Sequence, residues 1–208
     1  MKHWWKHPAD PIPVLCIGLC LVLWLGGGVW RWGSDLAARA TGRMEPFALT
    51  AQDLTPVNLQ ATGDNTYQTE TEDPQLLWDN PDGRRIRSLT LTAAFSASPR
   101  EICLYYTTAP GEDYSVEHRV FPTEGPDGSY RFVLPHTPVA SLRLDPCSPL
   151  TGQPIAVTLE SLTGNGPVPV WQYFAPGWFG LVQAVLYTAL ACALLCIVRD
   201  AVMWYKKK

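Results

Sequence analysis

The stretch IRSLTLTAAF, residues 86–95, decides the fold of the middle of this chain. Leu89, Leu91, Ala93 and Phe95 occupy every second position, with threonine and alanine between them. Alternation with period two is typical of a β-strand that buries one face and exposes the other. The run Ser-Ala-Ser-Pro at 96–99 follows directly, so we expect this strand to end there.

The same pattern recurs on both sides of this stretch. In Glu101–Thr107 the apolar side chains of Ile102, Leu104 and Tyr106 again share one face. Further strands are predicted at Ser115–Phe121, Tyr130–Leu134, Val139–Leu144 and Ile155–Leu162, with weaker candidates at Phe47–Asp53, Val57–Ala61 and Pro74–Trp78. Eight or nine short strands with Pro and Gly turns predict a mainly β fold, an antiparallel β-sandwich of the jelly-roll type. A small open barrel would give the same local signals.

Farther out, two uncharged apolar runs bracket this polar middle. Pro11–Trp30 and Gly177–Val198 hold 20 and 22 residues, and at about 1.5 Å per helical residue each covers the roughly 30 Å hydrocarbon core of a bilayer. The sequence therefore predicts two transmembrane helices around one ectodomain. The expected organisation is a tail at 1–10, a helix at 11–32, a juxtamembrane linker at 33–44, the β-sandwich at 45–165, a second linker at 166–176, a helix at 177–198 and a basic tail at 199–208.

The charges at the two ends predict the orientation. All five lysines lie in the two tails, and short loops rich in Lys and Arg stay on the cytoplasmic side. We therefore expect a two-pass protein of the plasma membrane with both termini in the cytoplasm and the β-domain outside. A cleavable signal peptide ending near Ala38-Arg39-Ala40 is the alternative for the first run, and it would leave the same domain exposed on a C-terminal anchor.

The composition of the polar middle argues against several functions. Residues 33–175 carry 17 acidic side chains and 9 arginines but no lysine, so the segment repels phosphate backbones and nucleic-acid binding is disfavoured. The carboxylates are scattered over turns, and neither His118 nor His136 has a Cys or carboxylate at a metal-ligand spacing. We expect no catalytic residue, no metal and no cofactor, and the lipid bilayer as one partner.

Several of the predicted strands resemble those of a known domain family. The run Ser141-Leu-Arg-Leu-Asp-Pro146, then Gly152 and Ile155–Leu162, is similar to the closing strand pair of galactose-binding-like jelly-roll domains, which include carbohydrate-binding modules. Ile102–Tyr106 and Asp73–Trp78 also resemble that family's strands. Such domains occur outside the membrane in bacterial envelope proteins that handle polysaccharide. The resemblance covers about residues 45–165 and implies a fold more than a ligand.

Four side chains are candidates for ligand binding, because sugar faces stack on aromatic rings and sugar hydroxyls bond to Arg and carboxylates. They are Trp78, Tyr105, Arg143 and Asp145. Each has a structural alternative: Trp78 would plug one end of the sandwich, Tyr105 would cap an outer face, and Arg143 with Asp145 would lock neighbouring strands.

The cysteines fall into two groups. Cys103 and Cys147 lie outside the predicted spans, where an oxidising environment permits a disulfide; two separately buried thiols are the alternative. In each predicted helix two cysteines stand four residues apart and share one face, Cys16 with Cys20 and Cys192 with Cys196. Four facing thiols would suit a soft metal or a redox relay, but thiols are also ordinary small packing residues in lipid, and packing is the interpretation that we favour.

Two functional hypotheses follow. The first is an outward-facing binding module that recognises glycan or assists cell-envelope polysaccharide assembly. The second is a non-catalytic accessory subunit, whose helices join a larger integral-membrane enzyme or transporter and whose sandwich binds no sugar.

Overall fold

A computed structural model describes residues 11–206, apart from the side chain of Trp178. The chain forms two compact units, Asp35–Val168 and a second unit made of the segments before and after it. The tail predicted at 1–10 and the last two residues of the tail predicted at 199–208 lie outside the described residues.

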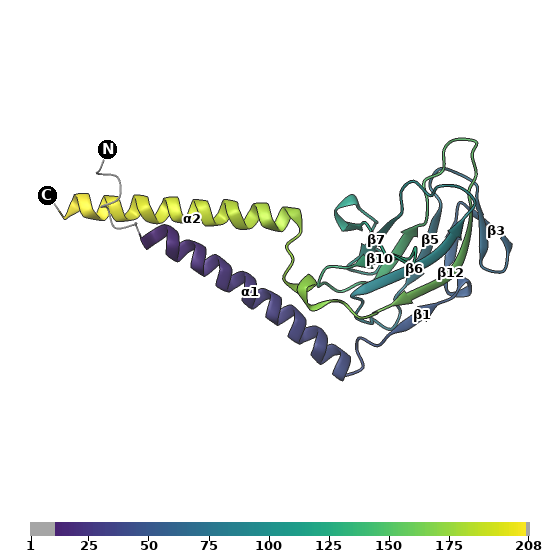
Figure 1. Ribbon diagram of the computed structural model, residues 1–208, viewed down its shortest axis with the longest axis horizontal. Coiled ribbons are helices and arrows are strands. Elements are labelled where there is room, and N and C mark those ends of the chain that lie inside the picture. The colour runs from purple at the N-terminus through teal and green to yellow at the C-terminus, as the bar shows by residue number, and fades with distance from the viewer. Residues whose placement is uncertain (1–10, 207–208) are drawn as a thin grey trace. The chain divides into compact units, whose positions relative to one another are not determined.

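The first unit is an antiparallel β-sandwich, as the alternating segments predicted (Figure 1). One sheet has the strand order β3-β4-β12-β6-β10-β9, with β1 also paired to β12, and the other has the order β2-β5-β11-β7-β8. The strands are β1 Phe47–Leu49, β2 Thr55–Val57, β3 Leu59–Gly63, β4 Thr66–Thr69, β5 Gln75–Asp79, β6 Ser88–Phe95, β7 Cys103–Thr107, β8 Arg119–Val120, β9 Thr123–Glu124, β10 Tyr130–Val133, β11 Ser141–Asp145 and β12 Ala156–Gly164. Strands β4 and β6 lie in one sheet and strands β5 and β7 lie in the other, so the chain crosses between the sheets at each step from β4 to β7. Neither sheet therefore forms from local hairpins alone.

The core lies between the sheets and uses the faces that the alternation predicted. Leu89 and Leu91 of β6 are almost fully buried, as is Leu104 of β7. Phe132 of β10 is the largest fully buried side chain and packs in the same cluster. Each Å² of apolar surface removed from water stabilises the fold by about 25 cal/mol, so this cluster is the main source of the unit's stability.

Strand β12 departs from simple alternation. Its register against β6 shifts between Leu159 and Ser161, and a β-bulge adds one residue on one side of a strand pair. The extra residue changes the parity, so both Leu159 and Leu162 are buried in the core. Strict alternation could not bury both.

Several boundaries differ from the prediction. The segment 115–121 forms a 3-10 turn, Val116–His118, before the two-residue strand β8. Strands β4 and β9 were not predicted, and Val57–Ala61 belongs to two strands, β2 and β3, which lie in different sheets. Short strands with few apolar residues leave little periodic signal.

The two apolar helices are α1 Pro11–Ala40 and α2 Trp178–Tyr205; the second unit contains α2 and the part of α1 as far as Ser34. Both helices are long and apolar enough, by length and composition, to cross a membrane. A 3-10 turn, η3 Val170–Tyr173, precedes α2, and a shorter one, η1 Ala51–Asp53, follows β1 in the sandwich. The predicted linker 33–44 is wrong as far as Ala40, because α1 continues through it, and α2 continues into the predicted tail 199–208.

Candidate functional site

Three of the four candidate ligand residues come together on the outer face of the five-stranded sheet. Tyr105 of β7 stands opposite Arg143 of β11, and Cys103 stands opposite Asp145. Their neighbours along each strand, Leu104 and Leu144, point into the core. The alternation that builds the core therefore places these polar side chains outward.

Arg143 is held by two carboxylates. Its Nε donates to Oδ1 of Asp145 at 2.7 Å and its Nη2 donates to Oδ2 at 2.8 Å. Nη2 also donates to Oδ1 of Asp73 at 2.5 Å. Burial raises the pKa of Asp145, while the bonds from Arg143 oppose that shift. The bidentate pair lies within β11, and the bond from Arg143 to Asp73 joins that strand to the segment before β5.

The same face continues into a row of guanidinium groups and rings, which we call the Tyr105 row: Arg143, Tyr105, Arg119 and Phe121. The Arg143 guanidinium carbon lies 5.0 Å from the Tyr105 ring centre, and that of Arg119 lies 4.6 Å from the Phe121 ring centre. Arg119 stands opposite Tyr105 and pairs with Glu101 at 3.7 Å. Tyr105 is half-buried, whereas 53% of Phe121 is exposed. Cation–π geometry keeps the rings in place beside charged hydrogen-bonding groups.

Trp78 lies apart from this row. It shares the inward face of β5 with buried Leu76 and stands opposite buried Leu142. Its ring stacks on Phe47 with a centroid distance of 5.7 Å, at the edge of the core. Trp78 thus has the packing position that the structural alternative described, and the structure does not bring it to the other three candidates.

Cys103 and Cys147 are both buried free thiols, so the candidate disulfide is not formed in this structure. The Cys103 Sγ lies 3.8 Å from Oδ2 of Asp145. Burial, and then the Asp145 charge, raises the pKa of Cys103 to about 11 and that of Cys147 to about 12. Both are held as protonated, weakly nucleophilic thiols at neutral pH.

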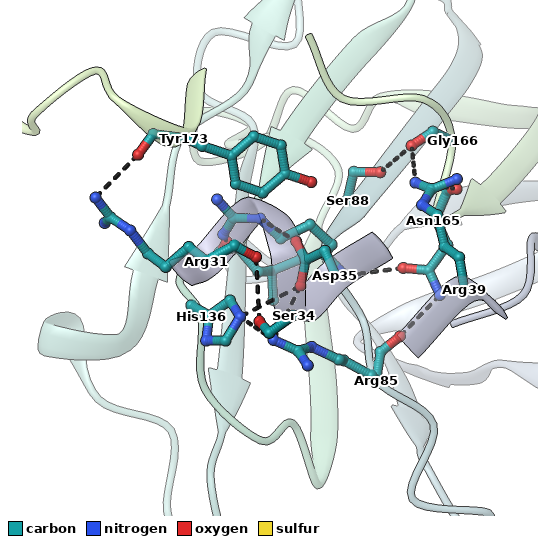
Figure 2. A network of polar contacts seen from close by, with 12 residues as sticks. Arg31, Ser34, Asp35, Arg39, Arg85, Ser88, His136, Asn165, Gly166 and Tyr173 are labelled. Atoms are coloured by element: carbon teal, nitrogen blue, oxygen red, sulfur yellow. Dashed lines mark hydrogen bonds and ion pairs between the residues drawn. The ribbon is translucent and has the colours of Figure 1, made fainter. Parts of the chain in front are cut away.

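A second polar cluster, at the end of α1, was not predicted. Figure 2 shows Asp35 with His136 and Arg85. The Asp35 carboxylate, whose side chain is 2% exposed, lies 2.9 Å from Arg85 Nη2, 3.4 Å from Arg87 Nε and 3.3 Å from His136 Nε2. Burial, and then the charge of Arg85, lowers the pKa of His136. One buried carboxylate thus serves two guanidinium groups, with a neutral imidazole beside them.

Fully buried Asn165 joins this cluster to both ends of the sandwich chain. Its Nδ2 donates to the carbonyls of Arg85 and Glu45, and its Oδ1 accepts from the backbone N–H of Arg87. Arg39 donates to the carbonyls of Asn165 and Gly166 at 3.3 Å each. We call the set of Asp35, Arg85, Arg87, His136 and Asn165 the Asp35 clamp. It holds the last turns of α1 at the point where the sandwich chain begins and ends.

Little in the sequence indicates this clamp. Asp35 lies 50 residues or more from its partners, and only the Arg84-Arg85-x-Arg87 run marks a local concentration of charge. A solvated charge run is the usual meaning of such a pattern. Among residues 11–206, no group of three or more His, Cys, Asp or Glu side chains could hold a metal ion.

No protein-family model and no curated protein matches this sequence. Solved structures of three binding modules resemble part of it. The low-affinity xylan-binding module CBM86 of Roseburia intestinalis is 15% identical, with 58% of this chain and 94% of that chain covered and a TM-score of 0.40. A β-1,3-glucan-binding CBM6 from Bacillus halodurans is 11% identical, with 60% and 97% covered and a TM-score of 0.36.

A CBM6 of Clostridium stercorarium, solved in complex with cellobiose, is 12% identical, with 60% and 95% covered and a TM-score of 0.33. TM-scores of this size assign no ligand to the present chain. Its function has to be argued from its own side chains.

Proposed function

We propose that this protein is a membrane-anchored, extracytoplasmic module that binds glycan on the Tyr105 row. The observation that carries the proposal is the exposed ring of Phe121 against Arg119, which itself stands opposite half-buried Tyr105. The apolar face of a sugar stacks on an aromatic ring, and the sugar hydroxyls form hydrogen bonds with guanidinium and carboxylate groups.

The roles within the row differ. Arg143 is committed to Asp145 and Asp73, so it positions Tyr105 rather than contacting sugar. Arg119 and Glu101 are 3.7 Å apart at their closest atoms, with 32% and 50% of their side chains exposed. These two therefore supply the accessible donors and acceptors, while Phe121 and Tyr105 supply the stacking surface.

The two apolar helices give the module its location. With both helices in the membrane and the terminal lysines in the cytoplasm, the sandwich faces outward. Within the described residues, the ionisable groups on the outer face pair with one another in ways that stabilise strands rather than activate a nucleophile. Binding without catalysis, in support of envelope polysaccharide assembly, is the function that this arrangement favours.

A glycan array tests the proposal with the full-length protein in nanodiscs. We expect the wild type to bind at least one polysaccharide saturably. Phe121→Ala and Tyr105→Ala should each weaken that binding about tenfold or more, because each removes stacking surface worth roughly 1.4 kcal/mol.

Leu150→Ala is the matched control. Leu150 is 50% exposed, as Phe121 is, but lies outside the row. Folding of every variant is checked by its thermal unfolding. Absence of binding by a folded wild type, or equal losses in the Leu150 variant, would refute the proposal and favour the accessory-subunit hypothesis.

A further inference from the structure

One face of α1 contacts the chain that leads into α2. Trp24, Gly28 and Arg31 share this face at helical spacing. Trp24 Nε1 donates to the carbonyl of Phe174 at 3.0 Å. Arg31 Nη2 donates to the carbonyl of Tyr173 at 2.9 Å (Figure 2). A Cβ on buried Gly28 would lie 2.4 Å from Cδ1 of Phe174, so only glycine admits the ring. These contacts close one end of the space between the helices.

Beyond these contacts, α1 and α2 line a groove-like cavity of about 550 Å³ that is open along part of its boundary. Small residues, Gly180, Ala184, Thr188 and Ala191, follow one another along the α2 wall. Such residues usually let two membrane helices pack closely. Here they line open space instead. The α1 wall extends the face of Trp24, Gly28 and Arg31 through Cys20 and Cys16, with Leu19 and Leu23 beside them.

The cavity walls are apolar over most of their length. Thr188 satisfies its hydroxyl by donating to the Ala184 carbonyl at 2.6 Å. A bilayer offers no water to fill such a space, and 550 Å³ lies within the range of small-molecule pockets. Hydrocarbon is therefore the chemistry that fits the walls. The intramembrane cysteines Cys16 and Cys20 belong to these walls.

The closed end of the cavity has the opposite chemistry. Arg31 lines it, and its guanidinium group uses two N–H donors on the carbonyls of Gly27 and Tyr173. A guanidinium group has five such donors, so others are left for an anion. The flanking Trp30 and Trp32 are 73% and 40% exposed, as expected of side chains at the headgroup level of a membrane.

We propose that this cavity binds one phospholipid, with an acyl chain between α1 and α2 and the phosphate on Arg31. The charge complementarity of a single arginine at one end of a long apolar cavity selects an amphipathic anion. The site rests on the membrane placement proposed above and is independent of glycan binding. Because chain and phosphate contact different residues, the two contributions can be separated by substitution.

Native mass spectrometry of the full-length protein tests this proposal. The protein is purified in mild detergent and offered palmitoyl-oleoyl phosphatidylglycerol or, as a lipid without phosphate, palmitoyl-oleoyl glycerol. We expect one phosphatidylglycerol to remain on the wild type. Arg31→Gln should reduce retention of phosphatidylglycerol about tenfold relative to the neutral lipid. Ala184→Leu, which fills the cavity, should reduce retention of both.

Val185→Leu is the control, because Val185 neighbours Ala184 in sequence but is 65% exposed and does not line the cavity. Helical circular dichroism verifies that each variant folds. Carbonate extraction of the source membranes shows separately whether the protein is integral, so failed anchoring is distinguished from a failed lipid site. No retained lipid, equal retention in Ala184→Leu, or a co-purifying protein in place of lipid would overturn the proposal.

Discussion

Asp35 holds its carboxylate against Arg85 and Arg87 with only 2% of its side chain exposed. Asp35→Asn would leave those guanidinium groups without their anion, and removal of one partner of a buried ion pair typically costs about 3–5 kcal/mol. We expect a loss of that order in the free energy of unfolding, measured by urea titration of the full-length protein. Asp82→Asn is the control, since Asp82 and Arg84 are 61% and 49% exposed and such pairs contribute about 1 kcal/mol or less. Equal effects of the two substitutions would contradict the buried clamp.

His136 should make stability depend on pH. Burial, and then Arg85, lowers its pKa in the folded state, with Arg87 acting in the same direction and Asp35 opposing them. The unfolded chain, with a pKa near 6.5, therefore takes up the proton first as the pH falls. Stability should decline from about pH 6.5 downward to the lowered pKa. His136→Gln should flatten this part of the unfolding curve between pH 7.5 and 5.5. An unchanged slope would show that His136 is not the group responsible.

The buried thiols of Cys103 and Cys147 can be tested by alkylation. With none of the six cysteines in a disulfide, alkylation of the denatured protein without reductant should label every one. Four labels would show that Cys103 and Cys147 pair after all. In the folded protein at pH 8 these two should react slowly, because burial raises the pKa of Cys103 to about 11 and that of Cys147 to about 12. Mass spectrometry counts the labels in both cases.

Among the elements, the pairing of β1 with β12 depends on one glycine. A Cβ on Gly164 would lie 2.1 Å from the ring of Phe47, which is itself stacked on Trp78. Gly164→Ala should therefore destabilise the sandwich by about 1–3 kcal/mol through overpacking. Gly63→Ala in β3 meets its nearest atom at 3.9 Å and should be neutral. Comparable losses of unfolding free energy in both variants would rule out this packing argument.

The predictability of the elements followed the strength of their periodic signal. Leu89 and Leu91 fixed the inward face of β6 correctly, and the same parity placed Tyr105 and Arg143 outside. Trp78 could have been assigned to the core from its parity with Leu76. Phe121 could not be recognised as a site residue, because it contacts Arg119 only when the short strand β8 positions both.

At the scale of the whole molecule, the two apolar helices and the β-domain between them were evident from composition alone. The position of the boundary between the units was not. Asp35 sits in a stretch that lacks β-alternation, and its membership of the sandwich depends on ion pairs with Arg85, Arg87 and His136. Contacts between residues 50 or more positions apart leave no local pattern in a single sequence.

Membrane vesicles of known sidedness test most directly whether the tethered β-sandwich faces outward and binds glycan. Vesicles carrying the full-length protein are prepared right-side-out and inside-out, and each is incubated with a fluorescent form of the polysaccharide found on the array. We predict saturable binding to right-side-out vesicles only, lost about tenfold or more with Phe121→Ala. Equal binding to both preparations, or binding that survives Phe121→Ala, would contradict the account.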